Sequence, residues 1–242
     1  MKRKVKTKVK GFRTTDGAGV KLVRVLGNLT TKEFDPILML DSFDSINPDD
    51  YTAGFPMHPH RGIETISYVS RGKMVHRDSL GNEAGISDGE VQWMNSGSGI
   101  MHEEMVPAAE RLLGVQLWLN LPAKDKMSKP SYNSIKNEDI KEIEIEGGKI
   151  RLLAGKYGEH EGYKGDYLSM DYYDIHLNAD AEVTLTMEED DSVMVFTLLG
   201  DVYIDGEHIE EKTAVKLTEG DSLTIKNGNE KAQVLYMNSR AL

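Results

Sequence analysis

Short β-favouring runs recur along the whole chain, separated by glycines and by turn-forming segments such as Asp16-Gly17 and Asp88-Gly89. This spacing of short strands and turns is typical of an all-β sandwich or barrel. The strands expected in the first half are residues 20–26, 37–41, 63–70, 73–78, 89–94 and 114–119. Those expected in the second half are residues 140–145, 149–153, 171–177, 182–187, 192–199, 201–204, 213–217, 222–226 and 232–237. A short helical turn is expected near residues 107–111.

A length of 242 residues accommodates one domain or two of roughly 100–130 residues each. Residues 122–137 are polar and bracketed by prolines, which indicates a connection between domains. We therefore predict two domains, residues 1–130 and residues 131–242.

A weak internal repeat supports two copies of one β-module. Gly72 followed by Gly89-Glu90 is matched by Gly200 followed by Gly220-Asp221, with spacings of 17 and 20 residues. In each case a strand turns at glycine, and the chain returns to a glycine–acid pair before the next strand.

Two histidines, His58 and His60, stand two residues apart in a β-favouring region. Alternate side chains of a strand leave from the same face, so both imidazoles can reach one ion. Forty-two residues after His60, a glycine-rich turn leads to His102, Glu103 and Glu104. Three imidazole nitrogens and one carboxylate suit Fe, Zn, Cu or Ni, and an octahedral ion held this way keeps about two positions open. The alternatives are a closed tetrahedral zinc site and histidines that only form hydrogen bonds in a barrel core.

The spacing leaves two carboxylates open as the fourth ligand. Glu64 has the same parity as His58 and His60, whereas Glu104 has the same parity as His102. Glu103 should point away from the metal. The second copy of the repeat lacks this set, because the matching offsets fall on Thr186, Glu188 and Gln233. Only the first half is therefore expected to bind metal in this way.

Composition excludes several other functions. The chain has no cysteine, so disulfides, thiolate ligands and cysteine nucleophiles are absent. No apolar run is long enough for a membrane span, and no secretory signal is evident, so we expect a cytoplasmic location. Seven basic residues within residues 1–13 are expected to form an edge strand or a frayed terminus. Residues 131–242 carry 24 acids and 11 bases, so direct nucleic-acid binding is not expected.

The two metal-ligand stretches resemble the two motifs of the cupin superfamily, and more narrowly the pirin family. The segments that carry this resemblance are His58-Pro59-His60-Arg61-Gly62, Gln92-Trp93-Met94, Gly97-Ser98-Gly99-Ile100-Met101-His102-Glu103-Glu104 and Gln116-Leu117-Trp118-Leu119-Asn120-Leu121-Pro122. The resemblance implies a bicupin, with two jelly-roll barrels in tandem and one iron-type metal in the N-terminal barrel. It also implies that the metal ligands are His58, His60, His102 and Glu104. Fe(II) is then the expected metal, with Zn, Ni, Mn, Co and Cu as alternatives.

The family resemblance implies two functions of different classes. Bacterial-type pirins resemble quercetinases, which cleave flavonols with O₂ and release carbon monoxide, and Glu104 would then act as the general base. Nuclear pirins resemble metal- and redox-dependent regulatory proteins that bind a protein partner. Glu64, Gln116 and His76 are candidates for orienting the histidine ligands from behind.

Overall fold

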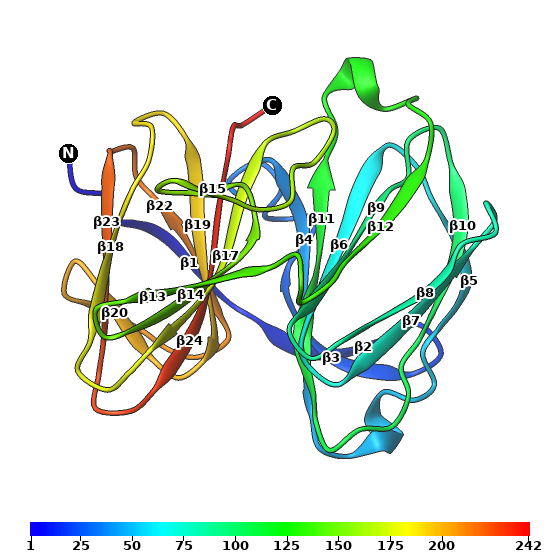
Figure 1. Ribbon diagram of the computed structural model, residues 1–242, viewed down its shortest axis with the longest axis horizontal. Helices are drawn as coiled ribbons and strands as arrows, with labels where there is room; N and C mark the ends of the chain where they lie inside the picture. The colour runs from blue at the N-terminus through cyan, green and yellow to red at the C-terminus, as the bar shows by residue number, and fades with distance from the viewer. The chain divides into compact units, whose positions relative to one another are not determined.

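The computed structural model describes residues 1–242 and consists almost entirely of β-strands (Figure 1). Contacts divide the chain into two compact units. We call residues 12–31 and 37–137 the N-terminal barrel, and residues 1–11, 32–36 and 138–242 the C-terminal barrel. The predicted domain ranges, 1–130 and 131–242, stay a prediction. No helix in the structure is long and apolar enough to span a membrane.

The N-terminal barrel contains one seven-stranded and one four-stranded antiparallel sheet. The larger sheet has the order β12 (Ser131–Ile135), β9 (Glu90–Asn95), β6 (Ile63–Arg71), β11 (Leu112–Asn120), β4 (Ile37–Ser45), β3 (Val20–Leu26) and β2 (Phe12–Asp16). The smaller sheet has the order β5 (Phe55–His60), β10 (Ile100–Met105), β7 (Lys73–Asp78) and β8 (Glu83–Ser87). The short 3₁₀ helices η1 (Pro48–Asp50) and η2 (Ala123–Asp125) lie in this unit.

The C-terminal barrel repeats the same plan. Its larger sheet has the order β1 (Val5–Lys10), β22 (Thr213–Leu217), β19 (Ser192–Leu199), β24 (Ala232–Ser239), β17 (Met170–Leu177), β14 (Gly148–Ala154) and β13 (Lys141–Ile145). Its smaller sheet has the order β18 (Glu182–Thr186), β23 (Ser222–Asn227), β20 (Val202–Ile204) and β21 (Glu207–Ile209). A short ribbon, β15 (Lys156–Tyr157) with β16 (His160–Glu161), completes the unit. The prediction of an all-β fold with two cupin-type barrels is confirmed.

The internal repeat corresponds to the shared topology of the two barrels, but Gly89 was matched to Gly220 although these two glycines lie in different turns. Gly89 precedes β9, whereas Gly220 follows β22, which is the counterpart of β9 in the sheet order. The counterpart of Gly89 is Lys212, which has a φ of +60°. The backbone N–H of Gly89 donates to the Val69 carbonyl oxygen of β6, and that of Lys212 donates to the Thr197 carbonyl oxygen of β19, each at 2.7 Å. Because a lysine adopts the left-handed conformation in this turn, a comparison of glycine positions could not find it.

Two short segments differ from the sequence expectation. Residues 107–111 form no helical turn. The buried Tyr51 hydroxyl donates to the Ala109 carbonyl oxygen and accepts from the Ala109 backbone N–H, each at 3.0 Å, so these groups are not free for helical hydrogen bonds. Residues 131–135 form strand β12 rather than part of a connection, and they pair with β9 from Ser131 opposite Asn95 to Ile135 opposite Val91. Sheet pairing with a distant strand leaves no local signature in such a polar segment.

The basic N-terminal residues form an edge strand, as expected. β1 pairs with β22 at the edge of the C-terminal sheet, and its lysines alternate toward solvent. In Figure 1 this blue strand runs among the yellow-to-red strands of the C-terminal barrel. Four lysines of this region form ion pairs with acids of the same barrel: Lys4, Lys6, Lys8 and Lys10. Lysine on an edge strand also discourages pairing with another chain.

Candidate metal centre

Strand β5 presents His58 and His60 on one face, as the alternation predicts. His60 is buried, His58 is half-buried, and Pro59 between them is exposed. β5 ends at His60, and Gly62 then turns the chain with a φ of +71°. A positive φ is favourable for glycine, so this turn can end the strand directly behind the second histidine.

Strand β10 brings His102 directly opposite His58 in the antiparallel register, and Ile100 lies opposite His60. His102 and Glu104 face the barrel interior and are each 1% exposed. Glu103 points the other way, as expected, with its carboxylate 3.7 Å from the Arg77 guanidinium. The strand pairing therefore gathers residues that are more than forty positions apart in the sequence.

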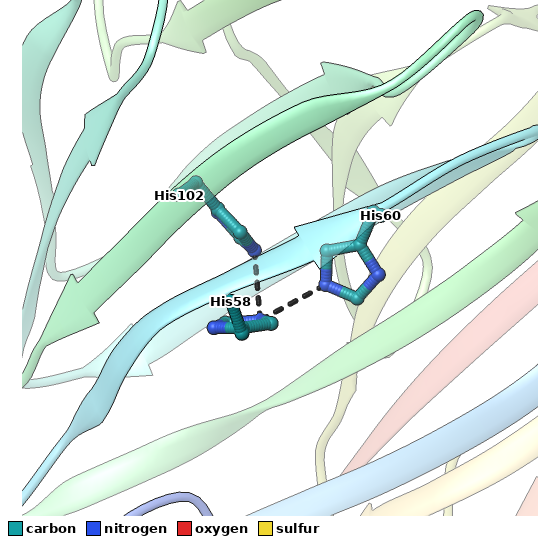
Figure 2. Close-up of side chains that lie close together, drawn as sticks. All are labelled: His58, His60 and His102. Carbon is teal, nitrogen blue, oxygen red and sulfur yellow. Dashed lines mark hydrogen bonds between the residues drawn. The ribbon is translucent and has the colours of Figure 1, made fainter.

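The three imidazoles converge through their Nε2 atoms (Figure 2). His58 Nε2 lies 3.0 Å from His60 Nε2 and 3.0 Å from His102 Nε2. The candidate ligand atoms of these three residues all lie within 4.8 Å of one another. These side chains are placed to hold a metal ion.

The hydrogen bonds of His58 fit a metal in this position. Its Nδ1 lies 2.8 Å from the carbonyl oxygen of Pro56, which can only accept. A neutral His58 ring therefore carries its proton on Nδ1, and its Nε2 presents a lone pair to the other two rings. Cis ligands at about 2.1 Å from a six-coordinate ion lie about 3.0 Å apart, close to the observed nitrogen separations. The donor set and its spacing fit a divalent transition metal.

Burial keeps two of the rings neutral. Burial, with His58 nearby, lowers the pKa of His60 to about 4. Burial, with His58 and His60 nearby, lowers the pKa of His102 to about 2. Neutral imidazole is the form that binds a metal, so the site is prepared for a cation at neutral pH.

Glu104 lies on the same face of β10 as His102 and is held by amide groups. Gln116 Nε2 donates to both carboxylate oxygens, at 2.8 and 3.0 Å, and Gln92 Nε2 makes a short hydrogen bond to Oε1. Burial raises the pKa of Glu104 above its usual range, and the Gln116 hydrogen bond acts in the opposite direction. The carboxylate is oriented in advance, although it is outside the group of three converging histidines.

The parity argument for Glu64 fails. Glu64 lies on β6, which belongs to the seven-stranded sheet, whereas His58 and His60 lie on β5 of the four-stranded sheet. The turn at Gly62 separates the two strands, so a continuous alternation cannot be counted across it. Glu64 is buried opposite Asn95 and Leu119.

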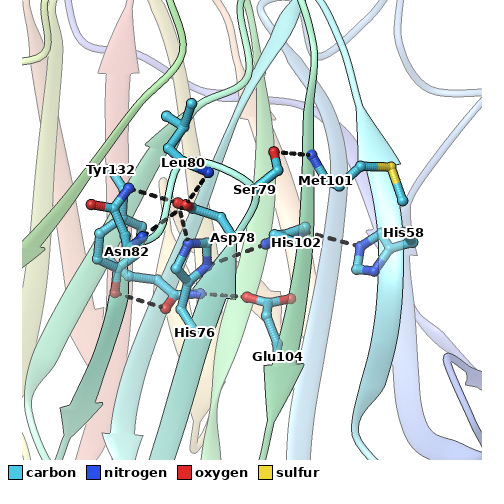
Figure 3. A network of polar contacts seen from close by, with 11 residues as sticks. His58, His76, Asp78, Ser79, Leu80, Asn82, Met101, His102, Glu104 and Tyr132 are labelled. Carbon is cyan, nitrogen blue, oxygen red and sulfur yellow. Dashed lines mark hydrogen bonds and ion pairs between the residues drawn. The ribbon is translucent and has the colours of Figure 1, made fainter.

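A second buried layer lies behind His102 (Figure 3). His76 Nδ1 is 3.3 Å from His102 Nδ1, and His76 Nε2 is 2.9 Å from Asp78 Oδ2. Tyr132 of β12 stacks on the His76 ring, with centroids 4.0 Å apart and planes 13° apart. The Tyr132 hydroxyl also donates to Gln92 Oε1 at 3.4 Å, which turns the Gln92 amide N–H toward Glu104.

A pocket of about 440 Å³ opens beside His58 and His60. Its other lining residues are Asp16, Gly17, Met39, Asp41, Phe43, Phe55, Pro56, Pro59, Gln116 and Trp118. The Trp118 ring meets His60 edge-on, with centroids 5.3 Å apart. Trp118 Nε1 is buried and has no hydrogen-bond partner. The pocket therefore combines apolar walls with polar side chains next to the histidines.

Several residues around the site were not predicted from the sequence: Ser67, Asp78, Gln92 and Tyr132. Asp78 and His76 lie two positions apart on β7, the same parity signal that pointed to His58 and His60. Gln92 and Ser67 also face the interior from strands that were predicted, where a polar residue is unusual. Tyr132 had no such signal because its strand was read as a connection.

Two family models match the chain. Pirin matches residues 19–119, and the Pirin C-terminal cupin domain matches residues 172–242. A Pseudomonas aeruginosa protein with the provisional name quercetin 2,3-dioxygenase is 39% identical over 227 residues, which cover 90% of this chain and 80% of the relative. Human pirin is 34% identical over 238 residues, which cover 95% of this chain and 79% of the relative.

Solved structures agree with these matches. A quercetin 2,3-dioxygenase from Acinetobacter baumannii has a TM-score of 0.90 at 28% identity, and the match covers 100% of this chain and 88% of that chain. A nickel(II) complex of a bacterial pirin from Escherichia coli has a TM-score of 0.77 at 19% identity, covers 98% of this chain and 99% of that chain, and supports the fold alone. Fold and site together define a bicupin with a histidine cluster in one barrel. Within that class, the chain belongs to the pirin family.

Proposed function

We propose that the chain is a metal-dependent dioxygenase that cleaves flavonols such as quercetin by O₂ insertion, with release of carbon monoxide. The observation that carries this proposal is the convergence of three imidazole nitrogens beside an apolar pocket. The names of the relatives from Pseudomonas aeruginosa and Acinetobacter baumannii support the same substrate class.

In this proposal His58, His60, His102 and Glu104 hold one divalent transition metal, with Fe(II) as the first candidate. Zn, Ni, Mn, Co and Cu are also compatible with three nitrogens and one oxygen. The nickel(II) in the Escherichia coli pirin structure belongs to that protein and makes nickel worth testing here. When bound, such a metal supplies Lewis acidity toward a coordinated hydroxyl and, for redox-active metals, access to O₂ chemistry.

The residues of the chain supply binding and proton handling. The side chains of Phe43, Phe55 and Trp118 give the pocket flat apolar walls that suit an aromatic ring system. A pocket of about 440 Å³ is within the range of small-molecule sites.

Glu104 is the proposed general base. One of its carboxylate oxygens would take the proton of the flavonol 3-hydroxyl. Gln116 and Gln92 keep the carboxylate aimed during the transfer. The competing role is that of a permanent ligand, in which case the proton leaves through water.

The test is aerobic turnover of quercetin by metal-free protein reconstituted separately with Fe(II), Ni, Mn, Co, Cu and Zn. We expect loss of the visible absorbance of quercetin and release of carbon monoxide with at least one metal, and no turnover with redox-inert zinc. His58→Ala should abolish both stoichiometric metal and turnover, whereas His208→Ala, an exposed histidine of the C-terminal barrel, should change neither. Metal binding without turnover for every metal would reject the dioxygenase proposal and favour a metal-dependent regulatory protein with a protein partner.

A further inference from the structure

The chain of side chains behind His102 ends in a carboxylate that can only accept hydrogen bonds. Asp78 Oδ1 receives the backbone N–H groups of Leu80 and Asn82, at 2.9 and 3.1 Å. Asp78 Oδ2 lies 2.8 Å from the Asn82 side-chain amide nitrogen and 2.9 Å from His76 Nε2. Asp78 therefore accepts from three donors besides His76, the arrangement expected of a carboxylate. The proton between Asp78 and His76 therefore belongs to His76 Nε2.

The position of that proton fixes the other nitrogen of His76. In a neutral ring with a proton on Nε2, Nδ1 is an acceptor. His76 is fully buried, and the hydrogen bond of its Nε2 to Asp78 fixes which edge of the ring faces His102. Its Nδ1 faces His102 Nδ1 at 3.3 Å, and only one proton can lie between two such nitrogens. His102 Nδ1 must supply it.

We propose that His76 and Asp78 are positioning residues that hold His102 in the tautomer with its proton on Nδ1, so that Nε2 presents a lone pair to the metal. The order of donors and acceptors, which we call the relay, is then Asp78 carboxylate, His76 Nε2–H, His76 Nδ1, His102 Nδ1–H and His102 Nε2. This inference rests on the metal site of the proposed function, but not on the reaction proposed for it.

The relay complements a different device at His58. The Pro56 carbonyl oxygen fixes the proton of His58 on Nδ1, and the relay fixes the proton of His102 on Nδ1. The two Nε2 atoms then face each other at 3.0 Å with no proton between them. Two opposed lone pairs at this distance repel one another unless a cation lies between them. The tautomers therefore favour metal binding before the metal arrives.

A pair of His76 variants separates the hydrogen bond from packing. Asn places its side-chain oxygen three bonds from Cα, as His does with Nδ1, so His76→Asn can still accept from His102 Nδ1–H. His76→Leu fills similar space without an acceptor. We expect His76→Leu to weaken zinc binding by about 10–100-fold and His76→Asn to weaken it by clearly less. Chelator competition on the full chain gives both dissociation constants.

Asp78→Asn reverses the relay while keeping its shape. The oxygen of the substituted amide would stay with the Leu80 and Asn82 N–H groups, which leaves its N–H₂ group facing His76 Nε2. His76 would then carry its proton on Nδ1 and force His102 to carry its own on Nε2, the atom needed for the metal. We expect a loss of zinc affinity similar to that of His76→Leu.

The ¹⁵N chemical shifts of the histidine rings in the zinc-loaded protein report the tautomers directly. We expect protons on His102 Nδ1 and on His76 Nε2. An unprotonated His102 Nδ1, or equal zinc affinities for His76→Leu and His76→Asn, would overturn the inference. Quercetin turnover plays no part in these measurements, so zinc binding that follows the expected pattern without turnover would reject only the dioxygenase proposal.

Discussion

The two barrels share one topology, yet equivalent positions carry opposite chemistry. In the N-terminal barrel His58 lies opposite His102 across β5 and β10. In the C-terminal barrel the equivalent strands β18 and β23 pair Val183 with Ile225. One step along, the pair of His60 and Ile100 is replaced by Leu185 and Leu223. All three metal-site histidines therefore have aliphatic counterparts.

The relay behind the site is replaced in the same way. Asp78 lies opposite His102, and its counterpart Ile204 lies opposite Ile225. His76 lies opposite Glu104, and its counterpart Val202 lies opposite Asn227. The apolar replacements Val183, Leu185, Val202, Ile204 and Ile225 all belong to one continuous hydrophobic core.

The comparison shows that this barrel does not need a polar interior to fold. Buried polar groups without partners cost free energy, so the N-terminal barrel must satisfy each of them by hydrogen bonds or a metal. The C-terminal barrel fills most of the same space with aliphatic side chains, and at the position of Glu104 it has the buried Asn227, which donates to the carbonyl oxygens of Leu177, Asn178 and Glu230. The histidines and Asp78 are therefore not required by the barrel fold.

The largest expected effect comes from giving the N-terminal barrel the residues of its counterpart. The variant His58→Val with His60→Leu and His102→Ile should bind no stoichiometric metal by elemental analysis, because all three nitrogen ligands are gone. The metal-free variant should be at least as stable as the metal-free parent in urea denaturation, since apolar residues replace buried polar ones. Residual stoichiometric metal in this variant would show that the histidine cluster is not the site.

Glu104→Gln tests the fourth ligand and the proposed base. Removing the carboxylate should lower turnover by about 10²–10⁴-fold and weaken metal binding, while the buried amide still fills the space. Glu64→Gln is the matched control, since Glu64 is also buried in the N-terminal barrel but lies on the other sheet. If Glu64→Gln reduces metal content and activity while Glu104→Gln does not, Glu64 is the functional carboxylate.

Features that depend on neighbouring residues in the sequence could be predicted, whereas features that depend on contacts between distant strands could not. The His58-x-His60 and His102-x-Glu104 pairs obey strand parity, and parity is local, so their faces were predictable. Parity failed for Glu64 because the chain changes sheets at Gly62. The neighbours Gln92, Ser67 and Tyr132 come from strands whose approach depends on the barrel closing, which no local pattern encodes.

The C-terminal barrel shows the same limit. Counting residues from glycines placed the counterparts of the histidines at Thr186, Glu188 and Gln233, whereas the sheet register gives Val183, Leu185 and Ile225. Gln233 was wrong because Lys212, and not a glycine, makes the turn that Gly89 makes in the other barrel. Thr186 and Glu188 were wrong because Val183 and Leu185 lie 17 and 15 residues before Gly200, whereas His58 and His60 lie 14 and 12 residues before Gly72. The counterparts Val183, Leu185 and Ile225 carry no metal-ligating atom, so the set of three histidines occurs only in the N-terminal barrel.

Arg3→Ala tests the stability of the C-terminal barrel without touching the metal site. The buried Arg3 guanidinium donates to the carbonyl oxygens of Glu188, Glu189, Asp191 and Thr218. Removing it leaves these acceptors without their donor, at a cost of about 3–5 kcal/mol in the free energy of unfolding. Metal content should remain that of the parent. If the variant loses metal as well as stability, the stability of the C-terminal barrel affects metal binding in the N-terminal barrel, contrary to this expectation.

The free energy of unfolding of the metal-free protein should depend on pH through the buried His60, whose counterpart in the C-terminal barrel is Leu185. The pKa of His60 is about 4 in the folded protein and about 6.5 unfolded, so the unfolded state takes up the proton first as the pH falls. The contribution of His60 is therefore fully present above pH 6.5 and is lost between pH 6.5 and about 4, at a cost of about 3 kcal/mol. The aliphatic triple variant lacks this titration. Equal pH profiles of urea unfolding for parent and variant would contradict the assignment.

The smallest expected effect concerns Tyr132 on β12, an edge strand of the larger N-terminal sheet. Its counterpart in the larger C-terminal sheet is β1. β12 carries Tyr132 over His76, whereas β1 pairs only with β22. Tyr132→Phe keeps the stacked ring and removes only the 3.4 Å hydrogen bond to Gln92, so stability should fall by about 1 kcal/mol or less. Zinc affinity should stay within about threefold of the parent, while Tyr132→Leu, which removes the flat ring, should weaken it further. If Tyr132→Phe weakens zinc binding as much as Tyr132→Leu, the hydroxyl and its Gln92–Glu104 contact matter more to the metal than the orientation of His76.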